Sequence, residues 1–484
     1  MSSRTQSYAA EGLCDELVDA AGVPRPHARQ LLDYFLTRDP QELVDRQHAV
    51  NRTIMDMGIS FTIYSEGDNI DRAWPLDAIP RAMSGREWDH IEAGLVQRLR
   101  ALNMFIDDLY NDRRILKDKV VPADIIDSSR NYLDPCKGIR PRHGVWAHIC
   151  GTDIVRGGDG EVYVLEDNLR VPSGVSYMLE NRNVIKRVFP SLFKHLKIRP
   201  IGEYPTQLSA MLNSLVPADR SGDSQEVVLL TPGIYNSAYF EHSYLARTMG
   251  VELVEGGDLV VGDDDRVYMR SIEGLVPIDV IYRRIDDVFM DPEVFRPDSM
   301  LGVPGIMRAW RAGNVALANA PGSGVADDKV VYSYVPEIIR FYLGEDPIIP
   351  NVPTWRCSEP QHLQHVLAQL PELVVKPANE SGGYGMLVGP HATRSEHEEF
   401  RRLLKANPRN YIAQPTLSLS TAPTLIGEAL EPRHLDLRPF ILQGSDFAVT
   451  AGGLTRVAMQ KGSLVVNSSQ GGGSKDTWIV EDTA

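Results

Sequence analysis

A chain of 484 residues is longer than one ordinary domain, so we expect two or three domains. Hydrophobic residues make up 43% and charged residues 24%, which is ordinary for a globular protein and excludes a disordered or fibrous chain. The formal net charge of −15 argues against a protein that binds nucleic acid along the phosphate backbone, because such binding needs a basic face.

The cysteine pattern and the apolar runs indicate a cytoplasmic protein. Cys14, Cys136, Cys150 and Cys357 form no C-x-x-C pair and are too few for a disulfide framework. The first residues contain no apolar leader segment, and no apolar run is long enough to cross a membrane. We therefore expect a reduced, soluble protein with no membrane contact.

The first 135 residues are predicted to be mostly helical. Ser84 and Glu87 form a capping-box pair before the longest helical pattern. The apolar residues that follow at helical spacing predict a buried stripe that belongs to the core. They are Ile91, Leu95, Leu99, Leu102, Phe105, Ile106 and Leu109.

Strands predominate from about residue 143. The β-rich runs 145–156 and 161–168 are joined by a glycine-rich turn, which predicts a hairpin. Residues 227–261 are typical of strand, helix and strand in a parallel sheet. A stretch rich in proline and glycine at 318–325 predicts a domain boundary, and strands return between about 410 and 480. The pattern predicts an α/β protein with several lobes.

Three oxygen-bearing side chains are expected to gather on the hairpin. Asp153 is predicted on one strand, and Glu166 and Asn168, which are two residues apart, on the same face of its partner. Two carboxylates and a carboxamide are suited to Mg²⁺ that carries nucleotide phosphates. The alternative is that they are ordinary polar residues of a hairpin.

A lysine stands at the end of an apolar strand. Lys376 ends LVVK and is followed by a turn with Gly382, Gly383 and Gly385, which can close over phosphates. The alternative is a surface hairpin with an exposed lysine. Arg438 and Arg456 lie in strand-like runs, where they neutralise phosphate charge or form ordinary ion pairs.

The two groups together resemble the ATP-grasp superfamily. VVKP with its glycine-rich turn is similar to the phosphate-covering strand and loop, and GTDIVRGGDGEVYVLEDN is similar to the metal-binding hairpin. Here the hairpin precedes the lysine strand, the reverse of the usual order. With EDNLRVPSGVSYMLENR and KGSLVVNSSQGGGSKDTW, this reversal resembles the circularly permuted ATP-grasp family (type 2), which is related to the synthetase domain of glutathionylspermidine synthase.

The resemblance implies a circularly permuted ATP-grasp fold of α/β lobes. Its expected parts are a helical N-terminal region (1–135), the metal-binding part of the C-lobe (136–200), a pre-ATP-grasp α/β domain (201–320), an ATP-binding lobe with a glycine-rich lid (321–415) and the remaining C-lobe strands (416–484). For one active site to form, the hairpin must face the 373–390 loop, and residues 434–466 must lie beside the hairpin in one sheet.

The resemblance also implies roles for individual residues. The implied Mg²⁺ ligands are Asp153, Glu166 and Asn168. ATP contacts are implied for Lys329, Lys376, the lid residues Ser381, Gly382, Gly383, Tyr384 and Gly385, and the hinge residues Ala413 and Gln414. Candidate catalytic groups are Arg438, Arg456 and Arg170, with Ser173 and Gly174 holding the transferring phosphoryl group. Candidate substrate contacts are Tyr235, Asn236 and His242, for which capping and packing are the alternative.

The implied activity is an ATP- and Mg²⁺-dependent ligase that joins a small-molecule or peptide carboxylate to an amine through an acyl phosphate and releases ADP. One alternative is a non-catalytic nucleotide-binding subunit that works with a co-encoded helical partner protein. Another is an ATP-grasp kinase that stops at phosphoryl transfer.

Overall fold

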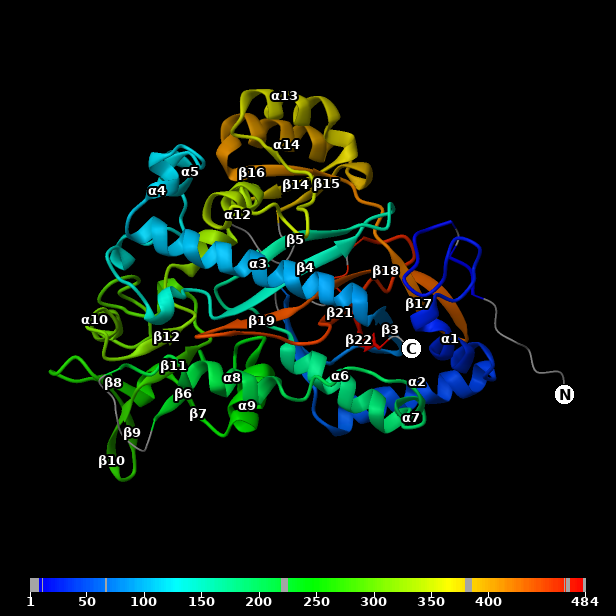
Figure 1. The fold of residues 1–484 in the computed structure, drawn as a ribbon, viewed down its shortest axis with the longest axis horizontal. Helices are drawn as coiled ribbons and strands as arrows, with labels where there is room; N and C mark the ends of the chain where they lie inside the picture. Colours follow the sequence, from blue (N-terminus) through cyan, green and yellow to red (C-terminus); the bar gives the residue numbers. More distant parts are fainter. Residues whose placement is uncertain are drawn as a thin grey trace.

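The computed structural model of the protein describes residues 8–10, 12–65, 68–218, 225–378, 385–464, 466 and 471–481. Figure 1 shows a mixed α/β molecule in which a large central sheet has a smaller sheet above it and a parallel sheet at its lower left. No helix within the described ranges is both long and apolar enough to span a membrane.

The central sheet has nine strands drawn from both ends of the chain. Its order is β20-β19-β4-β18-β21-β22-β3, with β5 paired to β4 and β17 paired to β18. All these pairs are antiparallel except β3 with β22. The strands are β3 (Leu76–Ser84), β4 (Ile149–Arg156), β5 (Val162–Asn168), β17 (Thr421–Ile426), β18 (Ala429–Arg438), β19 (Phe440–Gln443), β20 (Phe447–Val449), β21 (Leu454–Val457) and β22 (Gly473–Val480).

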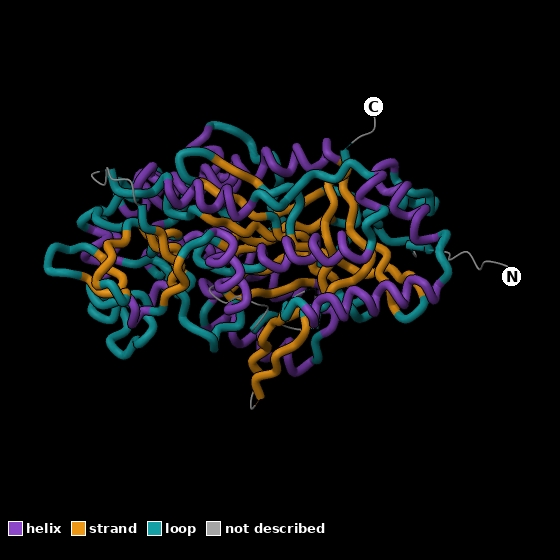
Figure 2. The backbone as a smooth tube through the Cα atoms, turned by 90° about the horizontal axis from the view of Figure 1, so that it is seen from below, coloured by secondary structure: helices purple, strands orange, loops and turns teal. Residues whose placement is uncertain are grey.

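Helices cover both faces of the central sheet, because its strands alternate apolar side chains between the faces. On β22, Ile479 packs in the cluster formed by α3 (Gly85–Tyr110). Its neighbours Trp478 and Val480 pack in the cluster that contains α2 (Pro40–Asp56) and α6 (Val175–Val188). Figure 2 shows the strands enclosed between helices.

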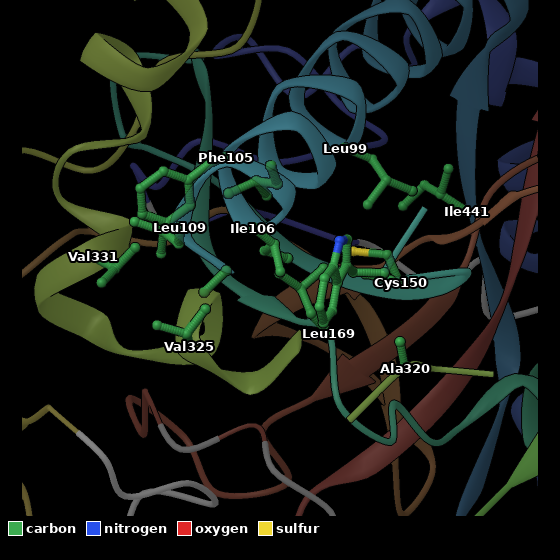
Figure 3. Close-up of a cluster of buried hydrophobic side chains, with 14 of the residues drawn as sticks. Leu99, Phe105, Ile106, Leu109, Cys150, Leu169, Ala320, Val325, Val331 and Ile441 are labelled. Carbon is green, nitrogen blue, oxygen red and sulfur yellow. The ribbon is translucent and has the colours of Figure 1, made fainter. Parts of the chain in front are cut away.

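The long helix α3 packs against the hairpin β4–β5 in one hydrophobic cluster. It begins at the predicted cap, where Ser84 Oγ accepts a hydrogen bond from the Glu87 N–H at 3.2 Å. The whole predicted stripe from Ile91 to Leu109 is buried. Figure 3 shows Leu99, Phe105, Ile106 and Leu109 of this stripe together with Cys150, which lies in β4, and Leu169, which directly follows β5.

A small antiparallel sheet forms the upper lobe, in the order β13-β16-β14-β15. Helices α13 and α14 cover one face of it, with their own apolar core around Val366, Val375 and Leu404. The opposite face is turned toward the hairpin (Figure 1). The elements are β13 (Trp355–Arg356), α13 (Pro360–Gln369), β14 (Leu373–Pro377), β15 (Leu387–Val388), α14 (Arg394–Ala406) and β16 (Tyr411–Pro415).

The third sheet is parallel, in the order β12-β11-β6-β7, and it confirms the strand–helix–strand unit predicted for residues 227–261. A three-stranded antiparallel sheet extends from it. The elements are α8 (Tyr204–Asn213), β6 (Val227–Leu230), α9 (Tyr239–Met249), β7 (Glu252–Val254), β8 (Leu259–Val261), β9 (Val267–Ser271), β10 (Gly274–Ile278), β11 (Val280–Arg283), α10 (Ile306–Arg311) and β12 (Ala316–Ala318).

Short helices connect these parts. Of these, α11 and α12 lead from the parallel sheet to the upper lobe, and α1 precedes α2. Their bounds are α1 (Arg29–Leu36), α4 (Arg114–Lys117), α5 (Ala123–Asp127), α7 (Leu192–His195), α11 (Lys329–Tyr332) and α12 (Val335–Leu343).

The structure confirms the sheet that the reversed motif order requires. Leu437 of β18 lies opposite Ile154 of β4, β19 continues this pairing along the same edge of β4 as far as Ile149, and β21 continues the sheet from β18. Residues from the last part of the chain thus complete the lobe that holds the hairpin.

Two features of the structure were not evident from the sequence. The N-terminal region contains β1 (Ser60–Ser65) and β2 (Asp68–Ala73), which form a hairpin, and β3, which joins the central sheet. The stretch at 318–325, where the sequence predicts a domain boundary, is buried throughout. A proline and glycine pattern marks a turn, and here tertiary packing covers that turn.

Candidate active site

The hairpin β4–β5 brings the three predicted metal ligands onto one face. Asp153 lies opposite Glu166, and Gly151 lies opposite Asn168. The register shifts just after Asp153, so Leu165 is an extra residue in β5, and such a bulge changes the direction of neighbouring side chains.

Asp153 is almost completely buried and is held by two arginines. Arg438 donates to both its carboxylate oxygens, at 2.5 Å from Nε and 2.7 Å from Nη2. Arg456 Nη2 donates to Oδ2 at 2.7 Å and also binds the buried Asp436. Burial alone would raise the pKa of Asp153, but the two guanidinium groups hold it below its ordinary range. Asp153 therefore stays ionised.

Glu166 faces two lysines from the upper lobe side. Lys329 Nζ lies 3.5 Å from Glu166 Oε2. Burial lowers the pKa of Lys376 to about 8, Lys329 adds to the shift, and Glu166 and Asp153 oppose it. The Lys329 N–H donates to the carbonyl of Ala378 at 2.9 Å, which ties α11 to the end of β14. Side chains far apart in the sequence thus form one charged cluster.

The oxygen donors of this cluster fit a hard divalent cation. Asn168 donates its amide N–H to the Gly151 carbonyl at 3.0 Å, and no hydrogen bond among the described residues uses its side-chain oxygen. No group of three or more His, Cys, Asp or Glu side chains with metal-binding geometry occurs among the residues described. The oxygen ligands that the site offers are the carboxylates of Asp153 and Glu166 and the amide oxygen of Asn168. This set suits Mg²⁺, with water and phosphate completing its coordination shell. The guanidinium of Arg438 already places positive charge between the two carboxylates.

A small apolar cluster, which we call the ring cradle, lies beside the acidic face. It is separate from the main cores and combines residues of the hairpin with the segment that follows β16. The sequence analysis did not identify it. Val155 shares a face with Asp153 by strand alternation and could have been found, but Leu417 and Leu419 meet it only through tertiary contact. The cluster consists of Val155, Tyr163, Leu165, Val352, Leu417, Leu419 and Leu464.

The N-terminal residues 14–16 contact the segment that joins β16 of the upper lobe to β17 of the central sheet. The Ser420 N–H donates to the Arg156 carbonyl, and residues 14 and 16 hydrogen-bond to the backbone of Thr421. Glu16 Oε1 accepts from Ser420 Oγ at 2.7 Å, Arg81 Nη2 at 2.9 Å and Arg156 Nε at 3.1 Å. These contacts fix the start of β17 next to the ring cradle.

The predicted hinge and lid are only partly described. Ala413 lies opposite both Trp355 and Val375, so its backbone sits between β13 and β14. Gln414 is buried and donates from Nε2 to Thr354 Oγ1 at 3.1 Å. Gly385 has a φ of 68°, a conformation that favours glycine. Ser381, Gly382, Gly383 and Tyr384 lie outside the described residues.

Arg170 is tied to two acidic residues of the parallel sheet side. It donates to Asp327 at 2.7 Å and to Asp286 at 3.0 Å, and its side chain crosses Gly324, where a Cβ would lie 2.3 Å from Arg170 Cδ. Burial raises the pKa of Asp327 to about 6, although Arg170 opposes the shift. In this conformation Arg170 joins the hairpin to the parallel sheet.

The loop that contains Ser173 and Gly174 is held by buried charges. Glu241 Oε2 accepts from the Gly174 N–H at 2.8 Å, and Arg284 binds Glu241, the Pro172 carbonyl and Ser173 Oγ. The Gly174 N–H is therefore occupied by a carboxylate of the protein itself. It is not directed at the cluster of Asp153 and Glu166.

The three candidate substrate residues lie past the end of β6. Tyr235 is 78% exposed, and Asn236 Oδ1 accepts from the Ala238 N–H at 2.9 Å in the turn just before α9. His242 is buried, with Nδ1 2.8 Å from Thr231 Oγ1, and burial lowers its pKa to about 2. The structure brings none of them into contact with the lysine and acid cluster.

Asn319 fastens the hairpin to the parallel sheet, and the sequence analysis missed it. Its Oδ1 accepts from the N–H groups of His148 and Ile149, and its Nδ2 donates to the carbonyls of Ile149, Leu169 and Arg170. An asparagine directly after an apolar strand was the available signal, since the carboxyl ends of parallel strands carry functional side chains.

A lysine-bearing antiparallel lobe that faces an acidic hairpin defines an ATP-grasp protein. The match to the family described as "Circularly permuted ATP-grasp type 2" covers residues 80–458. Because this is well over half of the sequence, the chain belongs to that family of ATP-grasp ligases.

Relatives and a solved structure agree with this membership. The chain is 54% identical over 477 residues to an uncharacterised protein from Synechocystis, covering 98% of each, and 47% identical over 471 residues to one from Mycobacterium tuberculosis, covering 97% of this chain and 84% of that one. A protein from Frankia casuarinae, provisionally named a glutamate–cysteine ligase, is 42% identical over 465 residues, which span 96% of this chain but 53% of that protein. A glutathione synthetase-like effector from Globodera pallida has a TM-score of 0.60 at 11% identity, covers 92% and 98% of the two chains, and shows likeness of fold alone.

Proposed function

We propose that the protein is an ATP- and Mg²⁺-dependent ligase that joins a carboxylate to an amine through an acyl phosphate and releases ADP. The observation that carries this proposal is the charged cluster in which Glu166 and Asp153 of the hairpin face Lys329 and Lys376. Two lysines beside two carboxylates form a site for phosphate and a divalent cation together.

The residues of the cluster would divide the work of phosphoryl transfer. Lys329 and Lys376 would bind the phosphates as point charges, and the ring cradle would take the apolar face of the nucleotide base. Asp153, Glu166 and Asn168 would hold Mg²⁺, which supplies charge neutralisation at the transferring phosphoryl group. Such transfer needs positioning and charge more than covalent help from the protein.

The thiols support a mechanism without a cysteine nucleophile. All four cysteines are free. Burial raises the pKa of the Cys136, Cys150 and Cys357 thiols, and burial with the charge of Glu16 raises that of Cys14. A thiolate is the reactive form of cysteine, so none of these thiols is activated. An acyl phosphate provides the leaving group instead, and an amine attacks it.

For the substrates, we propose an amino-acid or peptide-like carboxylate and an amine, in the cytoplasm. The glutamate–cysteine ligase name of the Frankia relative supports amino-acid chemistry, and the matched residues span 53% of that protein. Tyr235, Asn236 and His242 remain proposed substrate contacts, because they lie at the carboxyl edge of a parallel sheet. The co-encoded helical partner also remains a proposal.

Trapping with hydroxylamine tests the reaction. Wild-type protein is incubated with ATP, Mg²⁺ and a panel of amino-acid and peptide carboxylates, with and without a co-encoded partner, and ADP and hydroxamate are measured. Hydroxamate with ADP, absent for Glu166→Gln, is the expected result. AMP and pyrophosphate would refute γ-phosphoryl transfer, and a stable phosphorylated acid with no amide would indicate the kinase. Nucleotide binding without turnover under any condition would indicate the non-catalytic subunit.

A further inference from the structure

Arg438 occupies an unusual position between the two carboxylates of the cluster. It belongs to β18, and its guanidinium binds Asp153 through Nε and Nη2. The same Nη2 lies 4.0 Å from Glu166 Oε1, and Nη1 donates to the Ser173 carbonyl at 3.3 Å. One side-chain cation thus spans the pair that would hold a metal ion.

Gly151 makes this position accessible. A Cβ at Gly151 would lie 3.3 Å from Arg438 Cδ and 3.1 Å from the Cβ of Pro172. Both distances are shorter than ordinary van der Waals contact, so a larger residue would push the arginine aside. The absence of a side chain on β4 lets Arg438 cross the strand and reach Asp153.

Arg456 is placed differently, although it also binds Asp153. Its partners among the described ion pairs are Asp153 and Asp436, and Glu166 is not one of them. Asp153 therefore keeps one cationic partner when Arg438 leaves, which removes the cost of an unpaired buried carboxylate. Arg438 is the arginine that can move.

We propose that Arg438 is a stand-in cation, which holds Asp153 and Glu166 together in the nucleotide-free protein and turns away when Mg²⁺ enters with a nucleotide. This inference rests on the proposed function. A guanidinium and a divalent ion repel each other at this range, so metal alone binds poorly. Nucleotide phosphates supply negative charge that accepts the displaced arginine in a charge-assisted contact, so metal and nucleotide bind together.

Metal binding with and without nucleotide tests the stand-in role. Mn²⁺, as a spectroscopic probe for Mg²⁺, is titrated into chelator-treated full-length protein, and free Mn²⁺ is measured by electron paramagnetic resonance. Without nucleotide, Arg438→Gln should bind Mn²⁺ at least tenfold more tightly than wild type. With a non-hydrolysable ATP analogue the order should reverse, and the variant should bind the complex at least tenfold more weakly. A merely structural arginine would not produce opposite signs.

Matched variants keep the result interpretable. Arg394→Gln removes the same charge from a side chain that is 94% exposed on α14, and it should leave both affinities unchanged. Arg438→Lys keeps the charge but loses the two-pronged contact, so its Mn²⁺ affinity should be intermediate, and it serves if Arg438→Gln fails to fold. Equal Mn²⁺ affinity of wild type and both Arg438 variants would overturn the stand-in role. Failure of wild type to bind the analogue would instead refute the ligase assignment, because the nucleotide-free comparison is independent of it.

Discussion

Replacing Lys376 by methionine removes one positive charge at nearly constant side-chain length. Lys376 is half-buried at the end of β14, in the field of Glu166, Lys329 and Asp153. A hydrogen bond to a charged group contributes about 1.5–3 kcal/mol, so Lys376→Met should weaken nucleotide binding by about 10- to 150-fold. Isothermal titration calorimetry with a non-hydrolysable ATP analogue and Mg²⁺ at pH 7 measures this change.

The pH dependence gives the same experiment a second readout. Because the pKa of Lys376 is lowered to about 8, its ammonium is charged below that pH and neutral above it. Phosphate binds the charged form, so wild-type affinity should be full below pH 8 and fall as the pH rises to 9. Lys376→Arg stays charged and Lys376→Met stays neutral, so neither should show this fall. The exposed Lys405→Met on α14 is the control for loss of a lysine. Unchanged affinity of Lys376→Met would mean that Lys376 does not contact the nucleotide.

Three further substitutions test other contacts. Glu166→Gln should lower Mg²⁺-dependent ADP release by about 100-fold or more with little change in melting temperature, since its side chain is 26% exposed; wild-type turnover would remove Glu166 from the metal site. Glu16→Gln leaves Arg81 and Arg156 without their shared carboxylate and should cost about 3–5 kcal/mol of unfolding free energy in urea at pH 7. The pKa of Glu16 is lowered from 4.5 to about 2, so this difference should be full above pH 4.5 and vanish as the pH falls toward 2; a difference that persists in acid would contradict the ion-pair explanation. Asn319→Ala leaves two buried N–H groups unpaired and should cost at least about 3 kcal/mol in the same assay, whereas wild-type stability would show that other contacts hold the hairpin.

Local sequence patterns were sufficient to predict the elements whose contacts are short-range in the sequence. The glycine turn after Arg156 joins two strands whose pairing is short-range, and the stripe from Ile91 to Leu109 repeats within one helix. By contrast, β3 contains Asp77 and Pro80, which disfavour a strand locally. It becomes a strand because β22 pairs with it from the other end of the chain. No local window contains that information.

The same distinction applies to the candidate site. Asp153, Glu166 and Asn168 could be placed on one face from hairpin alternation alone. Which groups neutralise them could not be read locally. The resemblance implies a catalytic role for Arg170, and in the structure Asp286 and Asp327 bind it. These partners are brought in by tertiary folding, which motif spacing does not encode.

The pairing of β3 with β22 has a consequence for how the protein is made. Asp77 and Lys475, which form a buried ion pair across this contact, are 398 residues apart in the chain. During synthesis the hairpin leaves the ribosome long before β18 and β21 are translated. Asp153 therefore remains exposed to water until Arg438 and Arg456 have been added to the chain. Such non-local closure makes folding slow and exposes unpaired strand edges meanwhile. A nascent chain that ends before β18 contains the acidic hairpin but lacks the strands that pair with β4 and bury Asp153.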